Sequence, residues 1–403
     1  MVLCATAARG QDHPGGMLGF ETPWWPEIRR ECPLAFQGKT RDKWTHLETC
    51  IVYVLADDPI HPVLETIAPM SGLGGGLSGG WDLSHGRIQG DIAGHALVSV
   101  NRSWLLSAEY SIAPRLQSYP ARTPDRPRFD AYATLDELPQ LAFYTVGRAS
   151  RLYGQRELVS GADYTTPVTE WLRVGGRFEF RRASISGLDG TTSFVHYDAI
   201  VLLHYPMSPP HDVDAELNYH IFQDVEGHRL SFGRFNASGT WTRPLKRNVR
   251  SDTAHGPSIV DRVFCHEAKI RACDYGTLTV RGRLAVSSTF GRSTVPFYYQ
   301  PTLGGADINN YDTLRGFADY RFRGADDWLT QIEYGRTIWG PIGLLFFYDA
   351  GRVGLSFSRV HQDFGLGASV TVASRVVLRT YLAFGGGEGV GSAVRLTGVP
   401  VPR

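Results

Sequence analysis

The sequence has no long apolar run and almost no net charge. A transmembrane helix needs about 18 consecutive apolar residues, and no stretch of the sequence approaches that length. The longest apolar run, Ile342–Tyr348, is far too short. The formal net charge is +1 and the arginines are scattered, so we expect no nucleic-acid partner. Any membrane crossing would require a closed β-barrel, because only helices and closed barrels satisfy every backbone hydrogen bond in lipid.

Catalytic motifs are missing as well. There is no GxSxG, P-loop or HExxH motif, and no GxGxxG segment between a strand and a helix. The 13 histidines are dispersed and show no metal-ligand spacing. A barrel-borne lipid hydrolase using Ser107 and His95 is an alternative, but many other pairs would serve equally well. We therefore expect no enzyme activity, no cofactor and no metal site.

The five cysteines lack CxxC or zinc-site spacing. Cys265 and Cys273 could close a hairpin disulfide in an oxidising compartment, and free thiols fit the sequence equally well. Cys32 with Cys50 is a weaker second pair.

Residues 1–65 differ from the rest of the chain in their sequence pattern. They are broken by six prolines, and Val2–Ala8 resembles the end of a secretory signal. From Ser71 onwards, runs of alternating polarity are separated by Gly, Pro, Asp or Asn. The sequence predicts a signal remnant with a periplasmic leader over 1–65 and a barrel over 66–403.

The clearest strand patterns lie near the end of the chain. Phe364–Val372 places Phe364 and Leu366 on one face and Gly365 and Gly367 on the other, and Arg375–Phe384 alternates in the same way. Such strands of about 9–12 residues exceed the globular average of about 5–6 and suit a tilted membrane strand. The pattern predicts an all-β, transmembrane antiparallel barrel of about 16 strands. A soluble β-rich binding protein with a sandwich core is the alternative.

Other strands are expected along most of the remaining chain. A glycine-rich segment, Gly72–Gly80, is interpreted as the first barrel strand, and Tyr119–Pro139 and Lys246–Pro257 as loops. The expected strands are Ser71–Leu83, Arg87–Ser99, Trp104–Ala113, Leu138–Gly147, Leu158–Thr166, Trp171–Ala183, Phe194–Tyr205, Val213–Phe222, Leu230–Thr242, Ile259–Ile270, Thr277–Phe290, Trp328–Arg336 and Ile342–Ala350.

A long segment without strand pattern separates Phe290 from Trp328, and such loops are usually functional or disordered. It contains Leu303-Gly304-Gly305 and then Leu314-Arg315-Gly316-Phe317. Glu333-Tyr334 and Phe347-Tyr348-Asp349-Ala350-Gly351 follow on the next two predicted strands.

This ordered set resembles the C-terminal part of the BamA/TamA-type outer-membrane superfamily, also called bacterial surface antigens. The resemblance covers residues 290–396 firmly and 71–290 loosely. It implies a barrel of about 16 strands in the bacterial outer membrane, whose long loop in the sixth hairpin folds back into the lumen. It also implies that the loop arginine, Arg315, pairs with Asp349 and Glu333.

Strand alternation also predicts that the carboxylates of Asp349 and Glu333 point into the barrel lumen. Asp349 shares a face with Gly351, whereas Leu344 and Phe346 lie on the opposite, lipid-like face. An arginine fork can bind carboxylates bidentately, and a partly dehydrated lumen would strengthen the pair. Gly316 would allow a close backbone approach and Phe317 would wedge the loop against the wall. In the alternative interpretation, Arg315 and the carboxylates are simply solvated.

The family role implied is insertion or translocation of protein, or of lipid, through a weak seam between the first and last strands. The implied partners are outer-membrane lipid, an unfolded outer-membrane or secreted protein, and a separate periplasmic protein. The separate periplasmic protein is expected because residues 1–70 are too short, and too interrupted by proline, to resemble the POTRA domain that usually precedes such barrels. A passive pore or structural barrel is the alternative function.

Overall fold

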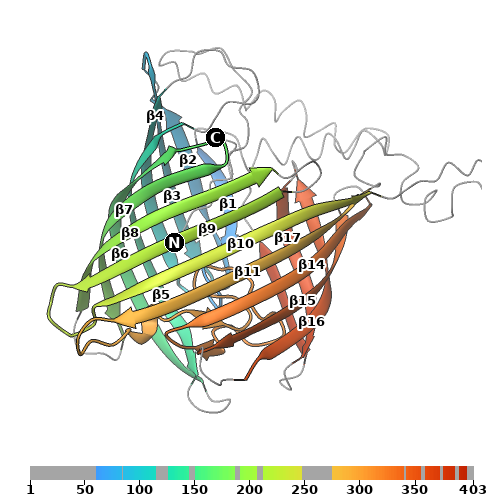
Figure 1. Cartoon of the computed structure of the whole chain (residues 1–403). Coiled ribbons are helices and arrows are strands. Elements are labelled where there is room, and N and C mark those ends of the chain that lie inside the picture. The colour runs from blue at the N-terminus through green and yellow to red at the C-terminus, as the bar shows by residue number, and fades with distance from the viewer. Residues whose placement is uncertain are drawn as a thin grey trace, which may run out of the picture.

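The computed structural model describes residues 60–83, 85–114, 126–144, 150–186, 191–206, 212–246, 275–339, 342–354, 359–372, 375–385 and 390–396. In these ranges, 16 strands form one antiparallel sheet in chain order, wrapped around a lumen and inclined to its axis (Figure 1). They are β1 (Ile60–Thr66), β2 (Leu73–Asp82), β3 (Ile88–Ser99), β4 (Trp104–Pro114), β5 (Arg128–Tyr144), β6 (Ser150–Pro167), β7 (Leu172–Ile185), β8 (Thr191–Pro206), β9 (Asp212–Asp224), β10 (Phe232–Lys246), β11 (Tyr275–Thr289), β14 (Asp327–Trp339), β15 (Ile342–Val353), β16 (His361–Val372), β17 (Arg375–Gly385) and β18 (Val390–Leu396).

The two end strands, β1 and β18, approach each other and form the seam of the barrel. Within the described ranges no hydrogen-bonded ladder joins them, whereas every other pair of neighbours has one. No helix in this part of the chain is long and apolar enough to span a membrane.

Alternation along the strands separates an apolar outside from a mixed inside, as predicted. On β15, Phe346 is 53% exposed and Leu344 39%, whereas Leu345 and Phe347, which alternate with them, are buried. On β16, Phe364 and Leu366 are exposed and Gly365 and Gly367 are buried. A side chain at Gly367 would lie 3.1 Å from both Leu345 and Tyr381, so small residues at these inward positions let larger neighbours close over them.

The start of the barrel differs from the prediction. The first strand, β1, begins at Ile60, before the predicted boundary at residue 66, and it is not the glycine-rich strand. The glycine-rich strand is β2, one position in from the seam. The short, proline-containing β1 was missed because prolines usually interrupt strands, but they are tolerated at sheet edges.

The predicted loop Tyr119–Pro139 is wrong in its second half, because β5 begins at Arg128. Pro139 lies where the β5–β6 register shifts between Leu138 and Leu141, a position at which a missing backbone N–H interrupts no regular ladder. The predicted strand Ile259–Ile270, most of the predicted loop Lys246–Pro257, and Cys265 with Cys273 lie outside the described residues.

Residues 290–326 connect β11 to β14 and fold into the lumen, as predicted; we call this segment the plug loop (Figure 1). It contains the short helix η2 (Phe297–Tyr299) and the paired strands β12 (Thr302–Leu303) and β13 (Phe322–Arg323).

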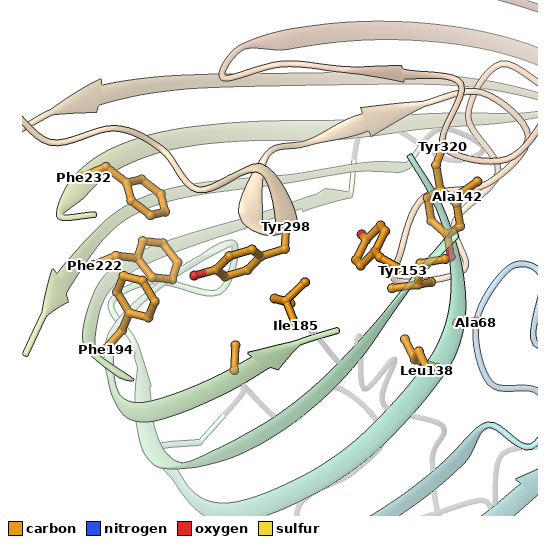
Figure 2. Close-up of a cluster of buried hydrophobic side chains, with 12 residues drawn as sticks. Ala68, Leu138, Ala142, Tyr153, Ile185, Phe194, Phe222, Phe232, Tyr298 and Tyr320 are labelled. Carbon is orange, nitrogen blue, oxygen red and sulfur yellow. The ribbon is translucent and has the colours of Figure 1, made fainter. Parts of the chain in front are cut away.

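The largest buried apolar cluster joins the plug loop to the barrel wall. In Figure 2, Tyr298 reaches from the loop towards Phe222 on the wall, and Tyr320 lies near Ala142. The cluster therefore packs the loop against strands β5 to β10. Its members are Ala68, Leu138, Leu141, Ala142, Tyr153, Ala183, Ile185, Phe194, Phe222, Phe232, Tyr298 and Tyr320.

Candidate functional site

A turn at two glycines and backbone hydrogen bonds order the plug loop. Gly304 and Gly305 adopt positive φ angles of 113° and 54°, which favour glycine. This turn lets the Gly305 N–H donate to the Leu314 carbonyl at 2.8 Å, and the Thr313 N–H donate back to the Gly305 carbonyl at 2.9 Å. The Leu-Gly-Gly motif thus positions the Leu-Arg-Gly-Phe motif.

The structure brings Arg315, Glu333 and Asp349 together; we call these three residues the lumen lock. The Arg315 guanidinium binds Asp349 bidentately, with Nε–Oδ2 and Nη2–Oδ1 distances of 2.8 Å each. Its third nitrogen, Nη1, donates to Glu333 Oε2 at 2.7 Å. Arg315 is 2% exposed and Asp349 0%, so this interaction is shielded from bulk water.

Aromatic and amide groups complete the surroundings of the guanidinium. Arg315 lies over the Phe347 ring, with its Cζ 3.6 Å from the ring centroid. Gln331 Nε2 donates to Asp349 Oδ1 at 3.2 Å and to the Thr313 carbonyl at 2.9 Å. Burial lowers the pKa of Arg315, but the hydrogen bonds and charges of Asp349 and Glu333 outweigh this effect and raise the pKa above its usual value.

The other predicted motif residues pack around the lock. A side chain at Gly316 would place its Cβ 2.7 Å from the Asp363 Cβ, so only glycine allows this approach. Leu314 and Phe317 are buried in a small cluster with Leu303 and Leu329. A Cβ at Gly351 would lie 2.8 Å from the Trp328 backbone oxygen and 3.2 Å from Leu303 Cδ1, which explains a glycine in the strand motif.

Sequence reasoning missed several residues of this site. Asp363 on β16 is buried beside Gly316, and Tyr381 on β17 lies near the Arg315 guanidinium. Arg379 Nη1 approaches Glu333 Oε2 to 3.5 Å, so this carboxylate is shared by two arginines. Period-two alternation would have placed these side chains inside, but no motif singles them out.

A further ion-pair group, also missed, fastens the middle of the loop. Arg283 on β11 donates to the loop residue Asp307 and to Asp327 on β14, each at 2.6 Å. Among the residues that the structure describes, no group of three His, Cys, Asp or Glu side chains is placed to hold a metal ion.

No family model and no curated protein matches the chain. Among solved structures, it is similar to BamA from Haemophilus ducreyi lacking POTRA domains 1–3, at 12% identity and a TM-score of 0.58, over 84% of this chain and 68% of that one. It is also similar to CdiB from Escherichia coli, at 9% identity and a TM-score of 0.52, over 84% of this chain and 62% of that one. The chain thus spans less than two thirds of that CdiB chain.

At such identities the likeness concerns the fold, which is that of a bacterial outer-membrane β-barrel. The apolar outer face of strands such as β15 and β16 matches that setting, because lipid-facing residues of transmembrane barrels are apolar. The chain is therefore an outer-membrane barrel that holds a loop in its lumen.

Proposed function

We propose that this barrel belongs to the BamA/TamA-type superfamily and inserts or translocates protein, or lipid, at the outer membrane through its seam. The observation that carries the proposal is the contrast between the lumen and the seam. Packed loop residues occupy the lumen, whereas β1 and β18 meet without a ladder in the described part of the chain. A passing or inserting segment would therefore find its opening at the side of the barrel.

The pairing of β1 supports a seam that opens. Val63, Leu64 and Glu65 lie opposite Gly76, Gly75 and Gly74 of β2. Cross-strand side-chain pairs stabilise a sheet, and glycine supplies none. β1 is thus held weakly on one side and, among the described residues, has no ladder on the other. A substrate strand could add to its free edge by β-augmentation.

A passive pore is the second candidate function. Charged and polar side chains on the inner wall, among them Asp130, Glu179 and Asp198, would suit a water-filled channel. The plug loop opposes this function, because it lies in the lumen and its apolar cluster packs it against the inner wall.

Disulfide cross-linking of the seam tests the proposal. In a cysteine-free variant, Leu64→Cys would be combined in turn with cysteine at each position of β18, 390–396. The matched control is Leu366→Cys with Leu382→Cys, outward partners in the β16–β17 ladder that leave the seam free. The assay follows the folding of a urea-unfolded outer-membrane barrel into liposomes that contain the protein.

We expect the unmodified protein and the control disulfide to accelerate folding of the model barrel, and an oxidised seam disulfide to abolish the acceleration until it is reduced. Full acceleration by a seam-locked protein would refute the lateral route. Stable, selective open currents in planar bilayers, together with no acceleration at all, would favour the passive pore.

A further inference from the structure

The plug loop also contacts the barrel away from the lumen lock and from the Arg283 ion pairs. This contact is made by Phe297, Tyr298 and Tyr299 of η2, which we call the aromatic anchor. The lock binds β14 and β15, whereas the anchor binds β5 to β10. The two contacts therefore fasten different parts of the loop to different parts of the wall.

Tyr299 makes the most extensive contacts of the three. Its hydroxyl donates to Glu157 Oε1 on β6 at 2.8 Å, and its carbonyl accepts from Arg234 Nη2 on β10 at 2.7 Å. Its ring lies edge-on to Phe194, with centroids 5.3 Å apart. The Glu157 carboxylate is held in turn by Arg181, whose Nη1 is 3.3 Å from Oε1.

The neighbouring rings add independent contacts. The Tyr298 and Thr192 hydroxyls are hydrogen-bonded at 2.6 Å, and Phe297 lies edge-on to Phe143 and Tyr153. Burial raises the pKa of Tyr298 to about 12, although the Thr192 hydrogen bond lowers it. Burial also raises the pKa of Tyr299 well above its usual value. Both hydroxyls thus stay protonated and available as hydrogen-bond donors.

We propose that the aromatic anchor is a separate fastening site of the plug loop, distinct from the lumen lock and from the Arg283 ion pairs, with Tyr299 as its main positioning residue. The two sites secure the loop from both sides of the lumen, so breaking the lock does not release the segment around η2. The inference does not depend on the cargo or on the seam, because both sites lie within the folded barrel.

Hydrogen exchange of the detergent-purified full chain measures the two sites separately, through peptides covering 294–303 and 312–318. Tyr299→Ala should speed exchange over 294–303 by at least about tenfold and leave 312–318 protected. Arg315→Ala should speed exchange over 312–318 and leave 294–303 protected. Tyr299→Phe, which keeps the ring, should give an intermediate increase over 294–303. The matched control is Tyr197→Ala, at an exposed tyrosine on the outer face.

Planar-bilayer currents provide a second readout. Each single variant should stay closed, because the other site and the Arg283 ion pairs still hold the loop, and the double variant Tyr299→Ala with Arg315→Ala should open more often than either single variant. If Tyr299→Ala does not fold, Tyr299→Phe and Glu157→Gln test the same hydrogen bond. Unchanged exchange over 294–303 in these variants, or equal opening of 312–318 by Tyr299→Ala and Arg315→Ala, would overturn the proposal.

Discussion

At the scale of single residues, Arg315 illustrates how a buried charge is tolerated. Removing a guanidinium from water is costly unless its hydrogen bonds are replaced in good geometry. Two carboxylates and the face of Phe347 replace the lost water here. Such a buried pair is weak evidence for net stability. Its geometry does, however, specify where the loop lies in the lumen.

Replacing Arg315 should therefore be far more damaging than replacing an exposed arginine. Arg315→Ala leaves Asp349 buried without its bidentate partner, a change that typically costs about 3–5 kcal/mol. Arg315→Lys should restore little, because an ammonium group cannot match the two parallel bonds. Urea midpoints of the detergent-folded barrel measure the effect, with Arg292→Ala in the exposed part of the loop as control. Equal midpoints for Arg315→Ala and the control would contradict this interpretation.

Gly316 offers a steric test of the same site. Gly316→Ala would bring a Cβ within 2.7 Å of Asp363 Cβ, and overpacking of this kind typically costs about 1–3 kcal/mol. The matched control is Gly282→Ala on β11, where an added Cβ meets nothing within 4 Å. We expect the first variant to unfold at lower denaturant concentration and the second to stay near the parent. The opposite order would mean that the loop is not seated against β16.

At the scale of elements, each strand has an apolar outer face and an inner face suited to its neighbours. On β15 the inner face carries the lock carboxylate and the outer face carries Leu344, Phe346 and Tyr348. A shift of register by one residue would exchange these faces, so burial of Asp349 and exposure of Phe346 enforce one register.

A charge on the outer face of β15 should therefore oppose membrane insertion. Phe346→Arg is expected to destabilise the inserted barrel by about 2–4 kcal/mol if the site lies near the bilayer midplane. Val100→Arg, in the exposed turn after β3, should have little effect. The heat-modifiable gel migration of each variant, after refolding into lipid, measures how much of it has inserted as a folded barrel. Full insertion of Phe346→Arg would argue against lipid contact at this face.

At the scale of the whole molecule, the plug loop and the seam determine which routes are open. The loop is tied to β11 and β14 through Arg283, to β14 and β15 through the lumen lock, and to β5–β10 through the apolar cluster. A segment fastened at several places is expected to open rarely, because these contacts must be lost together.

Removing the loop should convert the closed barrel into a pore. Replacing 291–325 with a short Gly-Ser linker keeps β11 and β14 whole and deletes the lock arginine and the aromatic anchor. Single-channel recordings should show large, steady currents for this variant and only rare openings for the parent. Comparable conductance of the two proteins would show that the loop does not seal the lumen.

Much of the fold could be predicted from the sequence. Period-two alternation indicated most strands, and the order of the Leu-Gly-Gly, Leu-Arg-Gly-Phe and Phe-x-Asp-x-Gly segments predicted the residues that the structure brings together. The prediction failed where prolines were taken to exclude strands, at β1 and in the first half of β5.

The sequence alone thus determined which face of each clear strand points inwards and that Arg315 would have acidic partners there. Both follow from local alternation and motif order. Tertiary structure alone decided that β1 rather than the glycine-rich strand lies at the seam, that Asp363 and Arg379 join the lock, and that Tyr299 reaches Glu157. The physical reason is that these contacts join residues far apart in the chain, 142 positions for Tyr299 and Glu157, and arise only when the barrel wraps around its own loop.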